Sequence, residues 1–206
     1  MTYIKTDIPQ PGIIELLFYK SSTGSALSNL AHTLLLGPST LTSGERELIA
    51  AHVSRLNNCE FCHESHAAAA TTHLGDNGKA IACLREDIES MPVSHKLKAL
   101  LHIATRVQQS GRNVSPDLIE NARKAGASDE CIHDAVLVAA AFCMYNRYVD
   151  GMNTMLPESK DEYIDMGKRM SKGYKYPPAI IRWFVKNVMR KNPVKIKPRN
   201  EKAFAE

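Results

Sequence analysis

The chain has 206 residues, of which 44% are hydrophobic and 23% charged, which excludes a disordered polar chain and allows one globular domain with a hydrophobic core. The formal charge of +4 is unevenly distributed, because the stretch from Ala179 onward carries +6 and leaves −2 for residues 1–178. A slightly acidic body argues against a nucleic-acid partner, and we interpret the basic tail as a solvated segment.

Helical periodicity dominates the chain, and no stretch shows the alternation of β-branched residues that marks a strand. Apolar spacing, capping residues, and Gly or Pro at the ends together predict the helices. In chain order these are a segment opened by Pro11–Gly12, then 26–36, 42–56, 59–73, 79–84, 94–109, 115–126, 128–152, a polar helix between Pro157 and Pro177, and 179–191. We therefore predict an all-α protein, a multi-helix bundle.

Two of these helices are predicted to form an antiparallel hairpin. Thr42 and Glu45 form a capping-box signature for the first helix, which runs to about residue 56. The pair Asn57–Asn58 breaks it, and the second helix begins near Cys59. The Cys-x-x-Cys pair is thus predicted at the start of a helix.

The chain is predicted to have three parts. Residues 1–178 form a helical domain, residues 179–192 an amphipathic helix, and residues 193–206 a basic, flexible tail. A basic amphipathic helix can lie on a membrane surface. Packing on the body or on a second subunit is more common, so we expect the helix to pack in a homo-oligomer (dimer, trimer or hexamer).

The sequence also indicates a location. No window approaches the roughly 18 uninterrupted apolar residues of a transmembrane helix, so no stable membrane insertion is expected. Residues 1–7 lack the basic stretch and apolar core of a signal peptide, so we expect a cytoplasmic protein. Thiols stay reduced there, and a close Cys pair is more often catalytic or metal-binding than structural.

The segment from Cys59 to His66 carries the chemistry. On a helix Cys59, Cys62 and His66 share one face, because residues three and four apart are neighbours. Only the thiolate is nucleophilic, and a free Cys has a pKa of about 8.5. The helix N-terminus, the second sulfur and an imidazole one turn away all favour the thiolate.

A carboxylate on the preceding helix could complete this arrangement. Glu47 and Glu45 are the candidates. In an antiparallel hairpin, residues 47–53 run beside residues 62–70, so Glu47 can approach His66.

Two other kinds of site use similar residues. Cys59-x-x-Cys62-His63 matches the attachment motif of c-type haem, although no export signal accompanies it. A metal could be held by Cys59, Cys62 and either His63 or His66, with His52 as a further candidate. No second Cys-x-x-Cys follows at finger-like spacing, and a thioredoxin-type site lacks its β-α-β setting. We expect neither a metal nor another cofactor.

Glu47, eleven intervening residues, then Cys59-x-x-Cys62-x-x-x-His66 resembles the signature of the alkylhydroperoxidase D-like, or carboxymuconolactone decarboxylase, superfamily. The stretch 146–151, Asn-Arg-Tyr-Val-Asp-Gly, is similar to that of its peroxidase-related branch. The resemblance covers roughly residues 10–190 and implies an all-helical fold.

The resemblance also implies residue roles. Cys62 would be the peroxidatic thiol, and Cys59 would donate a proton and then resolve the sulfenate as a disulfide. His66 would relay a proton to Glu47, the base. Alkylhydroperoxidase D proteins proper have a His just before the second Cys, where this chain has Phe61.

The implied partners are a hydroperoxide substrate and an unidentified thiol reductant. A decarboxylase-like enzyme is an alternative within the superfamily, but those relatives lack the redox cysteines. A non-redox metal-binding or interaction module is the alternative from another class.

Three polar residues near the end of the 128–152 helix have a structural interpretation. We predict that Asn146, Arg147 and Asp150 form a helix-end hydrogen-bond cluster, with Arg147 paired to Asp150.

Overall fold

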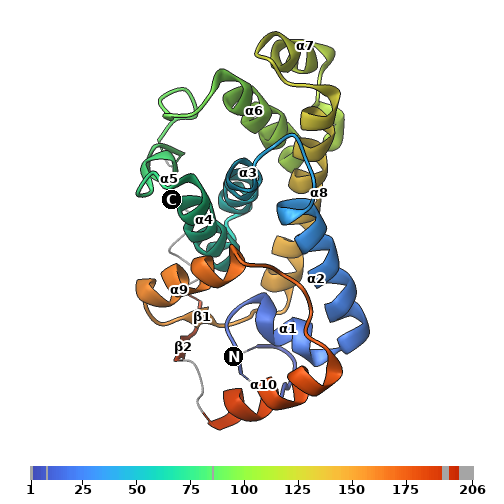
Figure 1. The fold of residues 1–206 in the computed structure, drawn as a ribbon, viewed down its shortest axis with the longest axis vertical. Helices are drawn as coiled ribbons and strands as arrows, with labels where there is room; N and C mark the ends of the chain where they lie inside the picture. Colours follow the sequence, from blue (N-terminus) through green and yellow to red (C-terminus); the bar gives the residue numbers. More distant parts are fainter. Residues whose placement is uncertain (1, 8, 85, 192–194, 200–206) are drawn as a thin grey trace.

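The computed structural model describes residues 2–7, 9–84, 86–191 and 195–199, and it confirms the prediction of an all-α bundle (Figure 1). The helices are α1 (Ile13–Tyr19), α2 (Ser21–Leu36), α3 (Ser43–Leu56), α4 (Glu60–Leu74), α5 (Lys79–Leu84), α6 (His95–Gln109), α7 (Pro116–Lys124), α8 (Asp129–Gly151), α9 (Lys160–Met170) and α10 (Ala179–Lys191), with a short 3₁₀ turn at Gly111–Asn113.

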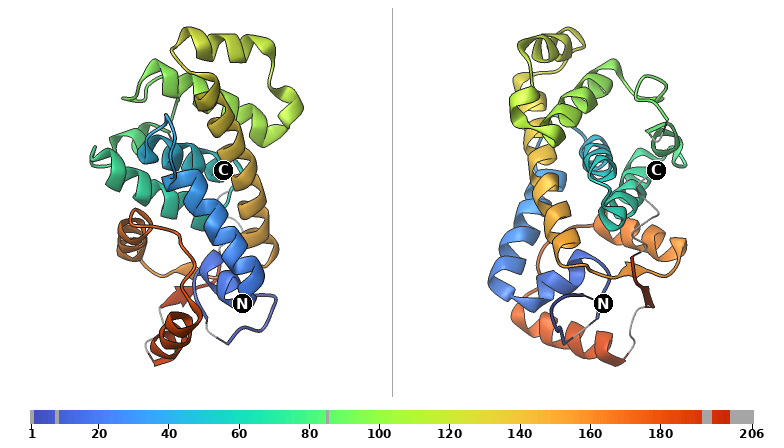
Figure 2. Two further views of the ribbon diagram at one scale, coloured as in Figure 1. Left: turned by 45° about the vertical axis from the view of Figure 1, so that its right-hand side comes forward. Right: turned by 180° about the vertical axis from the view of Figure 1, so that it is seen from behind.

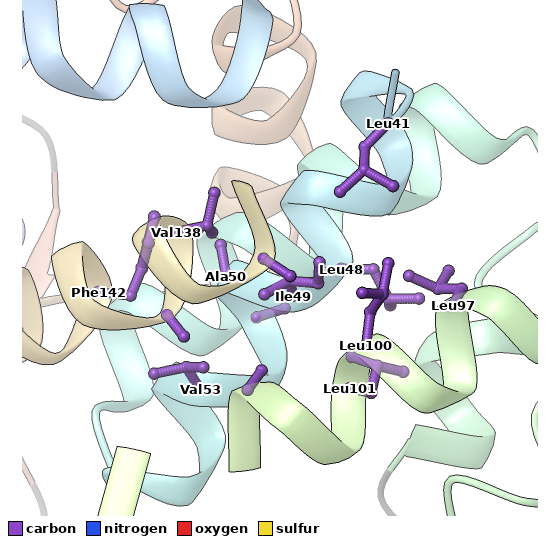
Figure 3. Close-up of a cluster of buried hydrophobic side chains, with 14 of the residues drawn as sticks. Leu41, Leu48, Ile49, Ala50, Val53, Leu97, Leu100, Leu101, Val138 and Phe142 are labelled. Atoms are coloured by element: carbon purple, nitrogen blue, oxygen red, sulfur yellow. The ribbon is translucent and has the colours of Figure 1, made fainter. Parts of the chain in front are cut away.

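Helix α3 is the centre of the core. It packs against α4, α6 and α8, and its residues 46–54 are all buried (Figure 3). Ala50 and Ala51 let the neighbouring helices approach closely, while Leu48, Ile49 and Val53 have no exposed surface. Burying each such large side chain contributes about 1.5–3 kcal/mol. The central position of α3 fixes the side chains that it directs toward α4.

Helix α9 covers α4 on the side away from the main core. The two helices cross at Gly167, where a Cβ atom would lie 2.6 Å from the backbone of Ala68. Tyr163 and Met166 of α9 are buried against the start of α4. This second cluster encloses the Cys pair.

The helix starts follow the capping residues. Thr42 and Glu45 make both hydrogen bonds of the capping box, as predicted. Ser94, Ser115 and Ser128 each accept a hydrogen bond from a first-turn backbone N–H. The start of α2 differs, because it begins at Ser21 rather than near residue 26.

One strand pair was not predicted. Strand β1 (Leu156–Pro157) pairs antiparallel with β2 (Ile196–Lys197), across about forty residues of sequence. Residues 195–199, which the sequence placed within a flexible tail, therefore lie against the body. Residues 193–194 and 200–206 of that tail lie outside the described residues.

Helix α10 lies at one end of the molecule, apart from the main bundle (Figure 2). Its apolar stripe was predicted to pack on the body or on a second subunit. Much of the stripe is exposed on the described part of the chain, since Phe184 is 62% exposed and Ile181 49%, whereas Val185 is half-buried. Packing on a second subunit stays a prediction.

Within the described ranges, no helix is both long and apolar enough to cross a bilayer.

The buried His52 of α3 makes the stability of this core pH-dependent. Its Nε2 lies 2.7 Å from Thr105 Oγ1, and its Nδ1 has no hydrogen-bond partner among the described residues. Burial, with smaller effects of Arg55, His102 and His63, lowers the pKa of His52 from 6.5 to about 4. His52 is therefore neutral at pH 7.

We expect acid to destabilise the fold through His52. The folded-state pKa is depressed, so the contribution of His52 is present above pH 6.5 and is lost as the pH falls toward about 4. The loss amounts to about 3 kcal/mol. Denaturant unfolding of the wild type and of His52→Gln, compared across this pH range, measures it. Equal pH slopes in both proteins would contradict the assignment.

Candidate active site

The turn between α3 and α4 sets the geometry of the site. Asn58 adopts a left-handed conformation (φ 56°), and the Cys59 N–H donates to Ser54 O at 2.9 Å. The Asn57 side chain donates to Asn146 Oδ1 at 2.8 Å, which anchors the turn to α8. Helices α3 and α4 therefore run antiparallel from a turn that these hydrogen bonds hold in place, as predicted.

The two cysteines lie at the buried start of α4. Cys59 is the N-cap residue and has no exposed surface, while Cys62 is in the first turn and is 4% exposed. Both thiols are free. The hydrogen bond between Cys59 and Cys62 is the main cause that raises the pKa of Cys59, followed by burial and by the charge of Cys62. Cys59 therefore holds its proton.

A tail residue that the sequence did not indicate lies beside Cys59. Arg199 pairs with Asp150 and donates from Nε to Thr154 O at 2.9 Å. Burial lowers the pKa of Arg199, but Asp150 and then Cys59 outweigh it and raise the pKa above its usual value. A guanidinium cation thus stands next to the proton-holding thiol, and strand β2 positions it.

His66 and Glu47 meet across the α3–α4 interface. His66 Nδ1 lies 2.7 Å from Glu47 Oε2, and the carboxylate has no exposed surface. An Nδ1–H that donates to this carboxylate leaves Nε2 as the acceptor. Phe142 packs edge-on against the imidazole at 4.5 Å between ring centroids, which holds its orientation.

A third residue, Tyr174, joins this pair. Its hydroxyl donates to Glu47 Oε1, and its ring stacks on His66 at 14° and 6.1 Å between centroids. Burial, and then the Glu47 carboxylate, raise the pKa of Tyr174 well above its ordinary value, so the hydroxyl stays protonated. Sequence reasoning missed Tyr174, because it lies in the irregular segment between α9 and α10.

A cavity of about 240 Å³ opens onto Cys62 and His66. It is lined mainly by apolar side chains from α1, α2, α4, α8 and α9 and by the segment before α10. These include Ile14, Leu17, Phe18, Phe142, Met166 and Met170. Cys59 is not among its lining residues, so a molecule in the cavity meets Cys62 first.

Phe61 replaces the His of the superfamily motif and is an apolar packing residue here. It is 2% exposed and packs against Tyr163 at 6.3 Å between ring centroids. Gly12 lies against the same ring with φ 57°, and a Cβ atom there would fall 2.2 Å from the Phe61 ring. The residue just before Cys62 is therefore a buried aromatic side chain rather than a base.

We expect Gly12→Ala to destabilise the protein and to disturb Cys62. The substitution places a side chain at positive φ and against a ring that has no room to move. Together these effects cost about 2–4 kcal/mol. Thermal unfolding measures the loss. Gly111→Ala is the control, because nothing lies within 4 Å of its Cβ position.

Two of the histidines proposed as metal or haem ligands, His63 and His52, point elsewhere. His63 is buried, and its Nδ1 lies 3.0 Å from Ala51 O. His52 hydrogen-bonds to Thr105 on the other side of α3. Among the residues that the structure describes, no group of three or more His, Cys, Asp or Glu is placed to hold a metal ion.

The polar cluster at the end of α8 is arranged differently from the prediction. Arg147 Nη1 donates to Cys143 O at 2.8 Å, so the predicted Arg147–Asp150 pair is wrong. Asp150 pairs with Arg199 instead. Asn146 is fully buried and donates to Ser54 Oγ at 3.0 Å, so it ties α8 to the α3–α4 turn.

Comparison with known families and structures places this site in context. Residues 22–106 match the model of the Carboxymuconolactone decarboxylase family, a stretch that includes Glu47, Cys59, Cys62 and His66. No curated protein sequence matches the chain.

Several solved structures share the fold. One is an uncharacterized peroxidase-related protein from Silicibacter sp. TM1040, with a TM-score of 0.67 and 26% identity, covering 75% of this chain and 78% of that chain. Another is an uncharacterized peroxidase-related protein with an alkylhydroperoxidase AhpD core from Ralstonia eutropha JMP134, with a TM-score of 0.66 and 24% identity, covering 77% and 81%. A protein of unknown function from Agrobacterium tumefaciens has a TM-score of 0.60 and 22% identity, covering 72% and 99%.

Proposed function

We propose that the chain is a member of the alkylhydroperoxidase D-like, or carboxymuconolactone decarboxylase, superfamily and acts as a thiol-dependent peroxidase that reduces an organic hydroperoxide. The match of residues 22–106 to the family model and the fold shared with a peroxidase-related protein support this proposal. The observation that carries the proposal is the geometry of the cavity. Of the two cysteines only Cys62 lines it, together with His66, which is paired to the buried Glu47.

The first step uses Cys62 as the nucleophile. His66 Nε2 takes the Cys62 proton, and the buried Glu47 carboxylate stabilises the imidazolium through Nδ1–H. The thiolate attacks the terminal oxygen of the hydroperoxide, so the O–O bond breaks and an S–O bond forms. Cys59 gives its proton to the departing alkoxide. The products of this step are an alcohol, a Cys62 sulfenic acid and a Cys59 thiolate.

The second step closes the disulfide. The Cys59 thiolate attacks the Cys62 sulfur, and the displaced hydroxide takes the proton from His66 to form water. The two sulfurs already share a hydrogen bond, so this step is effectively intramolecular. Both cysteine thiols have then been oxidised to one disulfide. An external thiol reductant restores them.

Arg199 and Tyr174 support this cycle from opposite sides. Arg199 favours the Cys59 thiolate that appears in the first step, because its guanidinium lies beside that sulfur. Tyr174 satisfies the second oxygen of Glu47, which keeps the carboxylate oriented toward His66.

The apolar walls of the cavity favour an organic hydroperoxide over hydrogen peroxide. A molecule without an apolar part gains nothing from the contacts with Leu17, Phe18 or Met166. The reductant, the homo-oligomeric state and the cytoplasmic location stay predictions.

Counting thiols tests the proposal. Reduced protein is mixed with stoichiometric cumene hydroperoxide, and free thiols and intact mass are measured before and after. We expect the Cys59 and Cys62 thiols to be lost together while Cys83, Cys131 and Cys143 stay free. Unchanged thiols would instead support a non-redox module or a decarboxylase-like enzyme.

A further inference from the structure

Helix α10 presents its apolar side chains to solvent. Ile180 is 79% exposed, Trp183 69% and Phe184 62%, and Ile181 and Val188 are also exposed. Exposed apolar residues are normal when scattered singly, but these five lie on one short helix. We call these residues the α10 apolar face.

Two basic side chains of the same helix, Arg182 and Lys186, face the body of the protein. The Arg182 guanidinium lies over the Tyr176 ring at 5.1 Å, and its Nη1 donates to Pro177 O at 3.0 Å. Lys186 lines a small cavity together with Asp7 and Glu15. An amphipathic helix on a protein surface normally buries its apolar side. Here five apolar side chains are exposed while Arg182 and Lys186 face the body, so the apolar face needs a partner outside the chain's described residues.

The sequence on both sides of α10 is strongly cationic. Residues 166–200 contain no Asp or Glu, and they include eleven Lys or Arg. Outside the helix, Lys168 pairs with Asp165, and five others have exposed side chains: Arg169, Lys172, Lys175, Lys195 and Lys197. The partner that fits is therefore both apolar and anionic.

We propose that α10 docks on the surface of an anionic phospholipid bilayer. The aromatic and aliphatic side chains would enter the boundary between headgroups and acyl chains, and the lysines would meet the lipid phosphates. A helix of 13 residues is about 20 Å long, too short to cross the bilayer, so it lies in the interface. Two copies that met through this face would bring two cationic segments together, and these repel each other. The phosphates of an anionic bilayer attract the same segments.

The docking helix is directly connected to the active-site cavity. Residues 173–177 line the cavity, and α10 begins two residues later at Ala179. Docking would therefore bring the cavity close to the bilayer surface. If the proposed peroxidase function holds, peroxidised lipid acyl chains become the natural substrate class.

Trp183 makes the docking directly measurable, because it is the only tryptophan in the chain. The full chain is titrated with vesicles of phosphatidylcholine alone or of phosphatidylcholine with phosphatidylglycerol. We expect a blue shift of the tryptophan emission and co-sedimentation with the anionic vesicles only. Added salt should weaken both, because it screens the lysines.

A matched pair of double variants distinguishes binding through the α10 apolar face from nonspecific hydrophobic binding. Ile180→Ser with Phe184→Ser should weaken vesicle affinity at least about tenfold, since two apolar side chains no longer leave water. The control is Leu137→Ser with Met144→Ser, which removes two exposed apolar residues from α8 and should leave affinity unchanged.

Other outcomes overturn the proposal. Trp183 emission that does not change on addition of anionic vesicles would contradict it. Equal losses of vesicle affinity in both double variants would also contradict it. If light scattering shows that the wild type is a dimer that does not bind vesicles, and that the Ile180/Phe184 double variant is a monomer, a second copy covers the face instead. Binding is scored without turnover and can be repeated with Cys62→Ser, so its failure is distinct from a failure of the peroxidase function.

Discussion

Cys62→Ser is expected to lower hydroperoxide turnover by about 10⁴-fold or more, because it removes the covalent nucleophile on which the later step depends. Serine is only slightly smaller than cysteine, and the buried Cys62 side chain lines the cavity. The fold should therefore persist, and the loss should appear in turnover rather than in thermal stability. Consumption of cumene hydroperoxide with a dithiol reductant measures it.

Cys59→Ser separates the two thiols. Cys62 should still react once, but no neighbouring thiol remains to form the disulfide. A dimedone-type probe should then label Cys62 stoichiometrically in this variant and not in the wild type. Cys143→Ser, which changes a half-buried cysteine outside the pair, is the control and should behave as the wild type. Full turnover in the Cys62 variant would contradict the mechanism.

Glu47→Gln is expected to lower turnover by about 10²–10⁴-fold, the usual range for general acid–base catalysis. The Gln oxygen keeps the hydrogen bond from Tyr174, so the amide NH₂ faces His66 Nδ1. His66 must then carry its proton on Nε2 and cannot accept the one from Cys62. The pH dependence of Cys62 alkylation should move to higher pH in the variant.

Tyr174→Phe tests the second contact of Glu47 with less disruption. It removes one hydrogen bond to a buried carboxylate, an effect of about 1.5–3 kcal/mol. The alkylation profile should shift in the same direction as in Glu47→Gln, but less. A loss of melting temperature with an unchanged profile would make Tyr174 a packing residue only.

The local pattern of the sequence was sufficient for the helices and for the placing of Cys62 and His66 on α4, where both line the same cavity. Thr42, Ser94, Ser115 and Ser128 cap helices where predicted, because capping depends on residues within one turn. The start of α2 was missed, because the Ser- and Gly-rich stretch 21–25 has the composition of a loop.

The approach of Glu47 to His66 was inferred from the hairpin alone, since α3 and α4 are consecutive and joined by the three residues 57–59. The pairing of Arg147 with Asp150 was wrong, although the two residues are three apart on one helix. Arg199, 49 residues further on, pairs with Asp150 instead.

The sequence by itself determined the all-α class and the place of Cys59 at the start of α4 with Cys62 and His66 on the helix, because these follow from contacts within three or four residues. Only the tertiary structure placed Tyr174 on Glu47 and Arg199 beside Cys59, since those contacts join segments far apart along the chain. It also decided which side of α10 faces outward. The helical period identifies an apolar face, but the packing of the rest of the chain decides whether that face is buried.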